Sequence, residues 1–287
     1  MTAPDLDALR REAIDALSAA GVPGPEVDAD LLIGHVLGLS RGGVQARALT
    51  RTAVDEADAR AIRAAIARRA AREPLQHITG LAPFRSLELA VGPGVFTPRP
   101  ETEFVVQFAI DALALVPSPE PLAVDFGSGS GAIALAMATE VPHARVVAVE
   151  KSPDALPWTA RNIERHGAGR VRLVEGDLAD ALPELDGLVD VVASNPPYIP
   201  LDAVPRDPEV RLFDPAVALY SGDDGLDAVR ALSRTARRLL RPGGALVIEH
   251  GELQAADIAA ILRADGFSAV ACHRDLLGRD RATTARR

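Results

Sequence analysis

From about residue 120 onward, short apolar runs alternate with longer segments, and this alternation constrains the fold more than any other feature. Such runs predict buried strands, and the segments between them predict helices. The predicted strands are Leu122–Phe126, Arg145–Val149, Val171–Glu175, Val189–Ser194 and Ala245–Glu249, with a weaker pair at Ser268–Cys272 and Ala282–Ala285. The predicted helices are Ala132–Thr139, Pro153–His166, Leu226–Leu240 and Glu252–Ala264. This order is typical of an α/β domain whose mostly parallel sheet is covered on both faces.

The preceding part of the chain has a different pattern. Apolar residues recur at a three-four spacing in residues 1–75, which predicts a small helical bundle. Residues 76–96 contain alternating apolar positions and a Gly-Pro-Gly turn, which predict a hairpin linking the bundle to a larger domain over 97–287. Arginines of the last bundle helix are predicted to form a solvated face, namely Arg60, Arg63, Arg68, Arg69 and Arg72.

Composition limits the possible classes of protein. No uncharged apolar stretch is long enough to span a membrane, and the chain start lacks a basic segment followed by an apolar block, so we expect a cytoplasmic protein. Cys272 is the only cysteine, which excludes an intramolecular disulfide and a thiolate metal cluster, and we expect it to be buried in a strand. Histidine spacing suggests no metal site. The net charge of -9 argues against a nucleic-acid binder.

A glycine-rich turn follows the first predicted strand. It reads Gly127-Ser128-Gly129-Ser130-Gly131, directly before a predicted helix. Glycines at every second position let the backbone approach a nucleotide cofactor. Glu150 lies 19 residues after Gly131, at the end of the next strand, where a carboxylate can accept hydrogen bonds from ribose hydroxyls. Asp177, after the third strand, is placed either to accept from an adenine amino group or simply to cap a turn.

A second motif follows the fourth predicted strand: Asn195-Pro196-Pro197-Tyr198. The Asn195 side-chain oxygen and the Pro196 carbonyl can accept hydrogen bonds from a flat NH2 group, and the prolines limit the freedom of the backbone. Tyr198 can pack on the flat face and favour positive charge on nitrogen. Ligands of parallel sheets bind at the carboxyl ends of the strands, where both motifs fall. Together they indicate methyl transfer onto a planar nitrogen.

Other functions fit parts of this pattern. The glycine-rich turn alone is compatible with a dehydrogenase, but that leaves the Asn-Pro-Pro-Tyr segment without a role. The same segment would support methylation of adenine N6 in nucleic acid, which the acidic charge opposes. A non-catalytic binding module is the third alternative.

The sequence resembles the N5-glutamine methyltransferases that modify peptide-chain release factors. The resemblance spans nearly the whole chain, and its most specific motif is Pro-Gly-Val-Phe-Thr-Pro-Arg-Pro-Glu-Thr-Glu at residues 93–103. Further similar segments are 74–80, 127–135, 194–200, 213–219, 223–227 and 278–281. Glu150 stands where the family usually has Asp, and Leu178 stands where some members have an aromatic beside adenine.

The resemblance implies a Rossmann-like catalytic domain that uses S-adenosyl-L-methionine. It implies that Leu178 and Asn195 contribute to the cofactor site with the glycine-rich turn, Glu150 and Asp177. The substrate would be the glutamine of the Gly-Gly-Gln motif in class I release factors, docked by the N-terminal bundle. Methylation of a glutamine on a ribosomal protein is a close alternative.

Overall fold

The computed structural model describes residues 4–287 as two compact units. The smaller unit holds the described residues up to Leu81 together with Arg206–Phe213. The larger unit holds Ala82–Pro205 and Asp214–Arg287. Residues 1–3, which begin the predicted bundle and the stretch without a secretory pattern, lie outside the described residues. No helix over residues 4–287 is long and apolar enough to cross a membrane.

The smaller unit is helical. Its helices are α1 (Leu6–Ala19), α2 (Pro25–Leu37), α3 (Arg41–Leu49), α4 (Glu56–Ala70), the short α5 (Leu75–Thr79) and α9 (Pro208–Phe213). Asp5, Ser40 and Asp55 each precede a helix and accept a hydrogen bond from the backbone N–H three residues later. The apolar face of α1 that the sequence predicts is buried in the core of this unit.

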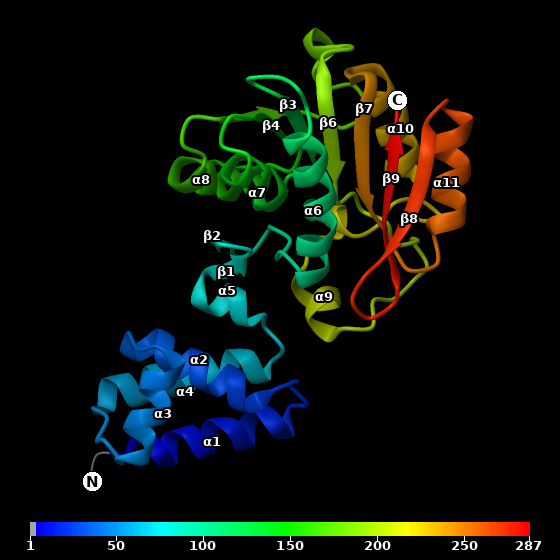
Figure 1. Ribbon diagram of the computed structural model, residues 1–287. Coiled ribbons are helices and arrows are strands. Elements are labelled where there is room, and N and C mark those ends of the chain that lie inside the picture. Colours follow the sequence, from blue (N-terminus) through cyan, green and yellow to red (C-terminus); the bar gives the residue numbers. More distant parts are fainter. Residues whose placement is uncertain (1–3) are drawn as a thin grey trace. The chain divides into compact units, whose positions relative to one another are not determined.

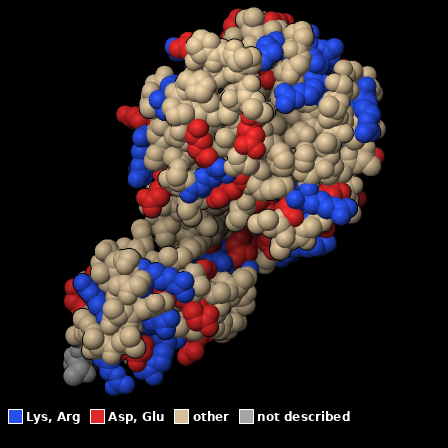
Figure 2. All heavy atoms as spheres, viewed as in Figure 1, with Lys and Arg blue, Asp and Glu red and all other residues tan. Residues whose placement is uncertain are grey.

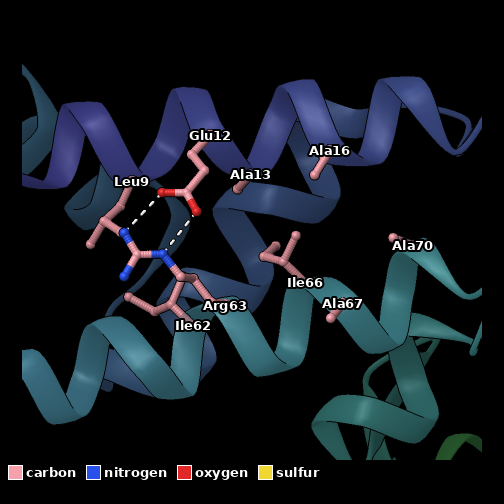
Figure 3. Close-up of a pocket in the computed structure, with 9 residues that line it drawn as sticks. All are labelled: Leu9, Glu12, Ala13, Ala16, Ile62, Arg63, Ile66, Ala67 and Ala70. Carbon is pink, nitrogen blue, oxygen red and sulfur yellow. Dashed lines mark hydrogen bonds and ion pairs between the residues drawn. The ribbon is translucent and has the colours of Figure 1, made fainter.

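An apolar hollow of about 160 Å³ lies between α1 and α4 (Figure 3). Alanines from both helices line much of it, because their small side chains do not fill the space between the helix axes. Glu12 and Arg63 reach across from the two helices and pair at 2.8 Å, with about half of each side chain exposed. The hollow is therefore bordered by an exposed ion pair.

The prediction of a solvated arginine face is wrong for Arg69 of α4 and for Arg72, which follows the end of this helix. The Arg69 side chain is only 7% exposed, and it contacts Asp28 at 2.7 Å and Glu209 at 2.9 Å. Arg72 contacts the other oxygen of Glu209 at 2.7 Å. Glu209 lies in α9, far along the chain, so the local sequence pattern could not reveal these partners.

The larger unit is built on a seven-stranded sheet (Figure 1). Its strands are β3 (Leu122–Phe126), β4 (Arg145–Glu150), β5 (Val171–Glu175), β6 (Val189–Ser194), β7 (Leu240–Glu249), β8 (Ser268–Arg274) and β9 (Asp280–Arg286). They lie in the order β5-β4-β3-β6-β7-β9-β8, with the first five parallel and β9 and β8 antiparallel. The predicted strands and the mostly parallel sheet are confirmed.

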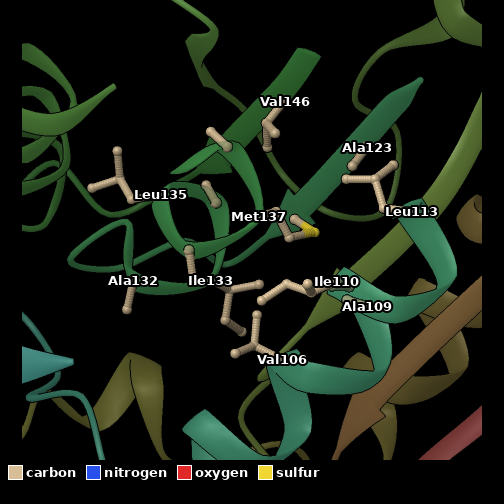
Figure 4. Close-up of a cluster of buried hydrophobic side chains, with 14 of the residues drawn as sticks. Val106, Ala109, Ile110, Leu113, Ala123, Ala132, Ile133, Leu135, Met137 and Val146 are labelled. Carbon is tan, nitrogen blue, oxygen red and sulfur yellow. The ribbon is translucent and has the colours of Figure 1, made fainter. Parts of the chain in front are cut away.

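Helices cover both faces of this sheet (Figure 1). One face packs against α6 (Pro100–Ala114), α7 (Ala132–Glu140) and α8 (Leu156–His166), the other against α10 (Asp227–Leu239) and α11 (Ala255–Ala264). Alternate residues of the central strands enter the two cores, as the two-residue period of a strand requires. Val146 of β4 and Met137 of α7 belong to the first core, which Figure 4 shows. The predicted α/β layering is confirmed.

Two smaller features complete the unit. The predicted hairpin is formed by β1 (Leu81–Phe84) and β2 (Leu87–Ala90), and Asn162 of α8 both accepts from and donates to the backbone of Ala90. Cys272 lies in β8, but its side chain is exposed, because β8 is the edge strand and most of its residues face solvent. The expectation of a buried cysteine is wrong.

Candidate active site

The glycine-rich turn connects the end of β3 to the start of α7. Gly127, Gly129 and Gly131 have φ values of 67°, 55° and 83°, a left-handed region that residues with a Cβ rarely adopt. The N–H groups of Gly127 and Ser128 donate to the Val149 carbonyl at 2.9 and 3.1 Å, which ties the turn to β4. The turn is thereby fixed at the carboxyl end of the sheet.

Glu150 ends β4 next to this turn, and it is only 6% exposed. Its Oε2 accepts from the Gly129 N–H at 2.7 Å, and its Oε1 accepts from the N–H groups of Lys151 and Ser152 at 2.9 and 2.8 Å. An ionised carboxylate has about four acceptor positions, so one remains on Oε2 for a hydroxyl donor. The predicted ribose contact is compatible with this geometry.

Asp177 and Leu178 follow β5. Asp177 accepts from the Ala179 N–H at 2.9 Å and pairs with Lys151 at 3.4 Å, and about half of its side chain is exposed. It therefore caps a turn in this structure, which was one of its two expected roles. Leu178 is half-buried and packs against the core on the α10 side of the sheet. Their contacts with adenine remain predictions.

The Asn-Pro-Pro-Tyr segment begins where β6 ends. The Ser194 hydroxyl donates to the Phe126 carbonyl at 2.7 Å, which joins this strand end to the start of the glycine-rich turn. Because β3 and β6 are parallel neighbours, the two predicted motifs lie together at one edge of the sheet. The Asn195 Nδ2 donates to the Thr102 hydroxyl of α6 at 3.4 Å. Pro196 is buried, while Pro197 and Tyr198 are half-buried.

Contacts on the other side hold this segment in place. The Ile199 N–H donates to the Leu219 carbonyl at 2.8 Å, and the Ile199 carbonyl accepts from Ser221 at 2.9 Å. The Gln254 side chain donates to the Tyr198 carbonyl at 2.9 Å. Gly225 packs so closely on the same carbonyl that a Cβ there would overlap it. The segment is thus held rigidly along its whole length.

The Tyr198 side chain meets charged groups that the sequence analysis did not include in the site. Burial, followed by the charge of Glu249, raises the pKa of Tyr198 to about 12, whereas Arg281 acts to lower this pKa through its charge and through hydrogen bonding. Burial also raises the pKa of Glu249 to about 7. Glu249 could have been included from the sequence, because it ends a predicted strand and the carboxyl ends of the strands form the site. Thr102 and Arg281 could not, because their proximity to the site depends on the three-dimensional fold.

Two further observations bear on a nucleic-acid-binding site and on a metal site. On the face of the larger unit that Figure 2 shows, Lys and Arg side chains are interspersed with Asp and Glu, without a continuous basic field. Over residues 4–287, no group of three or more His, Cys, Asp or Glu side chains could hold a metal ion.

Comparison with known proteins identifies the family. A family model described as a methyltransferase domain matches residues 122–281, and one described as the PrmC N-terminal domain matches residues 8–80. The chain is 52% identical over 279 residues to the release factor glutamine methyltransferase of Streptomyces coelicolor, and 96% of each protein is covered. The chain belongs to the release factor glutamine methyltransferase family. The resemblance inferred from the sequence is confirmed.

Two other comparisons show how far the likeness extends. The 4-amino-L-phenylalanine/4-methylamino-L-phenylalanine methyltransferase of Streptomyces pristinaespiralis is 44% identical over 204 residues, covering 70% of this chain and 69% of that protein. A methyltransferase structure from Pyrococcus furiosus has a TM-score of 0.52 at 21% identity, covering 70% of this chain and 89% of that one, and shows the shared fold. The Rossmann-like fold and the dependence on S-adenosyl-L-methionine are confirmed by family membership.

The residues at this edge of the sheet fit the cofactor. The positive-φ glycines leave backbone open where a side chain would otherwise stand, and no heavy atom lies within 4 Å of a Cβ built on Gly127. The spare acceptor on Glu150 suits a ribose hydroxyl, and Leu178 offers an apolar surface for a base. These side chains match the nucleoside part of S-adenosyl-L-methionine.

Proposed function

We propose that this chain methylates the side-chain amide nitrogen of the glutamine in the Gly-Gly-Gln motif of class I peptide-chain release factors. The observation that carries the proposal is the rigidly held Asn-Pro-Pro-Tyr segment beside the glycine-rich turn. The chain that contains it matches a release factor glutamine methyltransferase over 96% of its length. The partial match to an arylamine methyltransferase covers less of the chain. It is compatible with the same chemistry on a flat NH2 group.

The protein's task is to hold a weak nucleophile in position. An amide nitrogen shares its lone pair with the carbonyl group and attacks poorly. Asn195 Oδ1 and the Pro196 carbonyl would accept its two N–H groups, which fixes the amide plane and raises electron density on nitrogen. S-adenosyl-L-methionine supplies a methyl group on a positively charged sulfur, which keeps the bonding electron pair when the methyl passes to nitrogen.

Positioning and electrostatics are sufficient for this step. The nitrogen becomes acidic as it gains the methyl and releases its proton late, to water. Tyr198, next to the acceptors, would pack on the flat face and favour the developing positive charge. Glu150, Asp177, Leu178 and the glycine-rich turn would hold the cofactor on the other side of the reacting atoms.

The helical unit would dock the release factor, because a glutamine substrate on a protein needs recognition beyond the reacting side chain. The family model that matches residues 8–80 supports a shared role for this unit among its members. We propose that the enzyme acts in the cytoplasm, without a membrane or nucleic acid as a partner.

The proposal is tested by incubating the protein with labelled cofactor and one of four acceptors: a purified release factor, ribosomal protein, plasmid DNA or 4-amino-L-phenylalanine. Label on the Gly-Gly-Gln glutamine alone supports it. A release factor whose glutamine is replaced by alanine is the control. Label on adenine, on a ribosomal glutamine or on the free amine, with none on the release factor, contradicts it.

A further inference from the structure

Glu249 is a buried charged group to which the mechanism above gives no task. It ends β7, and β7 pairs with β6 so that Ile248 lies beside Ser194, the residue before Asn195. The side chain is buried, with 2% of the residue exposed, and its Oε2 has no hydrogen-bond partner. Burying a carboxyl with an unpaired oxygen costs free energy, and such groups concentrate at functional sites.

The contacts of Glu249 bear on the orientation of the Asn195 amide. Beside Glu249, the Asn195 Nδ2 donates to the Thr102 hydroxyl at 3.4 Å. Hydrogen bonding to Thr102 and to Asn195 acts to lower the pKa of the Glu249 carboxyl, which burial raises. An ionised carboxylate only accepts hydrogen bonds, so it is the NH2 group of Asn195 that faces it. Turning the amide over would place its oxygen against a carboxylate oxygen, and two acceptors repel each other. The carbonyl oxygen of Asn195 therefore points away from Glu249.

We propose that Glu249 is a positioning residue that locks the Asn195 amide with its carbonyl oxygen free to accept from the substrate NH2 group. This inference rests on the proposed function, because it takes Asn195 as the acceptor of the substrate amide. Glu249 acts through Asn195 and Thr102, without itself touching the reacting atoms.

The lock requires an ionised carboxyl, and several groups set its charge. Burial dominates and raises the pKa of Glu249 to about 7. Thr102 and Asn195 lower it through hydrogen bonds, Arg281 of β9 lowers it by its charge, and Glu101 of α6 raises it. Tyr198 faces the same group and stays neutral, because its own pKa is raised to about 12. His250, the next residue, contacts Thr283 and the Gly251 carbonyl instead.

As pH falls through about 7, Glu249 gains a proton and can donate as well as accept. The Asn195 amide is then no longer held in one orientation. Methylation of the release factor should therefore be fastest above this range and fall as the pH is lowered. The wild-type pH profile should show this fall, and its absence from the profile of Glu249→Gln would assign it to Glu249.

Glu249→Gln tests the lock directly, because glutamine keeps the shape but presents both a donor and an acceptor. We expect kcat on a purified release factor to fall about 10–100-fold, because the Asn195 oxygen is then no longer held in position for the substrate amide. The Kd for S-adenosyl-L-methionine, measured by calorimetry, should stay within about two-fold, and the fall in rate near pH 7 should disappear. Glu252→Gln, an exposed carboxyl in the next loop, is the matched control and should behave like wild type.

A double-mutant cycle separates positioning from a general structural effect. In the Asn195→Ala background, Glu249→Gln should change kcat by less than about two-fold, since no amide remains to be oriented. The proposal would be overturned if Glu249→Gln lowered kcat by the same factor in the Asn195→Ala background as in wild type. It would also be overturned if Glu249→Gln alone kept the wild-type rate and pH profile. Wild-type protein that leaves the release factor unmethylated would overturn the proposed function instead, and this inference with it.

Discussion

Glu209→Gln should destabilise the smaller unit far more than the same Glu→Gln substitution at an exposed ion pair of that unit. Glu209 binds Arg69 at 2.9 Å and Arg72 at 2.7 Å, and its side chain is only 13% exposed. Burial opposes its ionisation, but hydrogen bonds from both arginines hold the pKa of Glu209 below 4.5. Removing one partner of a buried pair costs about 3–5 kcal/mol, because the remaining charges are left uncompensated.

The structure places the expected value at or just below the lower end of that range, because both arginines keep another partner. Arg69 keeps Asp28 at 2.7 Å, and Arg72 keeps the Gly21 carbonyl at 2.5 Å, so we expect a loss of about 2–3 kcal/mol. Glu12 is the matched control, because it forms a similar pair with Arg63 with about half of each side chain exposed. Glu12→Gln should cost at most about 1 kcal/mol.

Native-state hydrogen exchange of α4 amides is the suitable assay, because it reports on the smaller unit by itself. The loss in Glu209→Gln should be present near neutral pH and shrink as pH falls below 4.5, where wild-type Glu209 also becomes protonated. Equal changes in exchange for Glu209→Gln and Glu12→Gln would refute the reasoning, since burial would then not determine the strength of the ion pair.

Three further predictions concern the larger unit. Gly225→Ala should lower kcat at least about ten-fold with unchanged cofactor affinity, because the added Cβ would overlap the Tyr198 carbonyl. Gly243→Ala is the control: Gly243 also has a positive φ but has open space around it, so this substitution should leave kcat unchanged. Burial raises the pKa of Asp125 to about 7, so ionising it costs folding free energy as pH rises from 3.8 towards 7. Over this window wild type should lose up to about 4 kcal/mol of stability relative to Asp125→Asn, so the melting temperature of the variant should rise relative to that of wild type; a pH-independent difference would be the contrary result. Glu150→Gln should weaken cofactor binding in calorimetry by at least about ten-fold, because a charged acceptor of the turn and of ribose is lost, and wild-type affinity would show that Glu150 does not hold the cofactor.

The sheet could be predicted because its central strands are buried on both faces and therefore form continuous apolar runs. Parallel topology then brings Gly127 and Asn195 to the same edge, since they follow neighbouring strands. The location of the candidate site thus follows from the order of strands and motifs. No side-chain coordinates are needed for that step.

What could not be predicted depends on contacts between distant segments. Arg69 and Arg72 have the spacing of an exposed helix face, and only the return of the chain at Glu209 buries them. Glu249 could be placed at a strand end, but its approach to Thr102 depends on how α6 packs on the sheet. Cys272 lies in a predicted strand, yet a strand at the edge of a sheet need not bury its side chains.

The central claim is that Asn195 holds a glutamine amide for methylation, and mass spectrometry of a release factor tests it most directly. The factor is incubated with cofactor and either wild-type protein or Asn195→Ala, and the Gly-Gly-Gln peptide is analysed. Wild type should add the mass of one methyl group to the glutamine, and Asn195→Ala should do so about 10²–10³ times more slowly while binding the cofactor normally. An unmodified glutamine with wild type, or equal rates for the two proteins, would contradict the account.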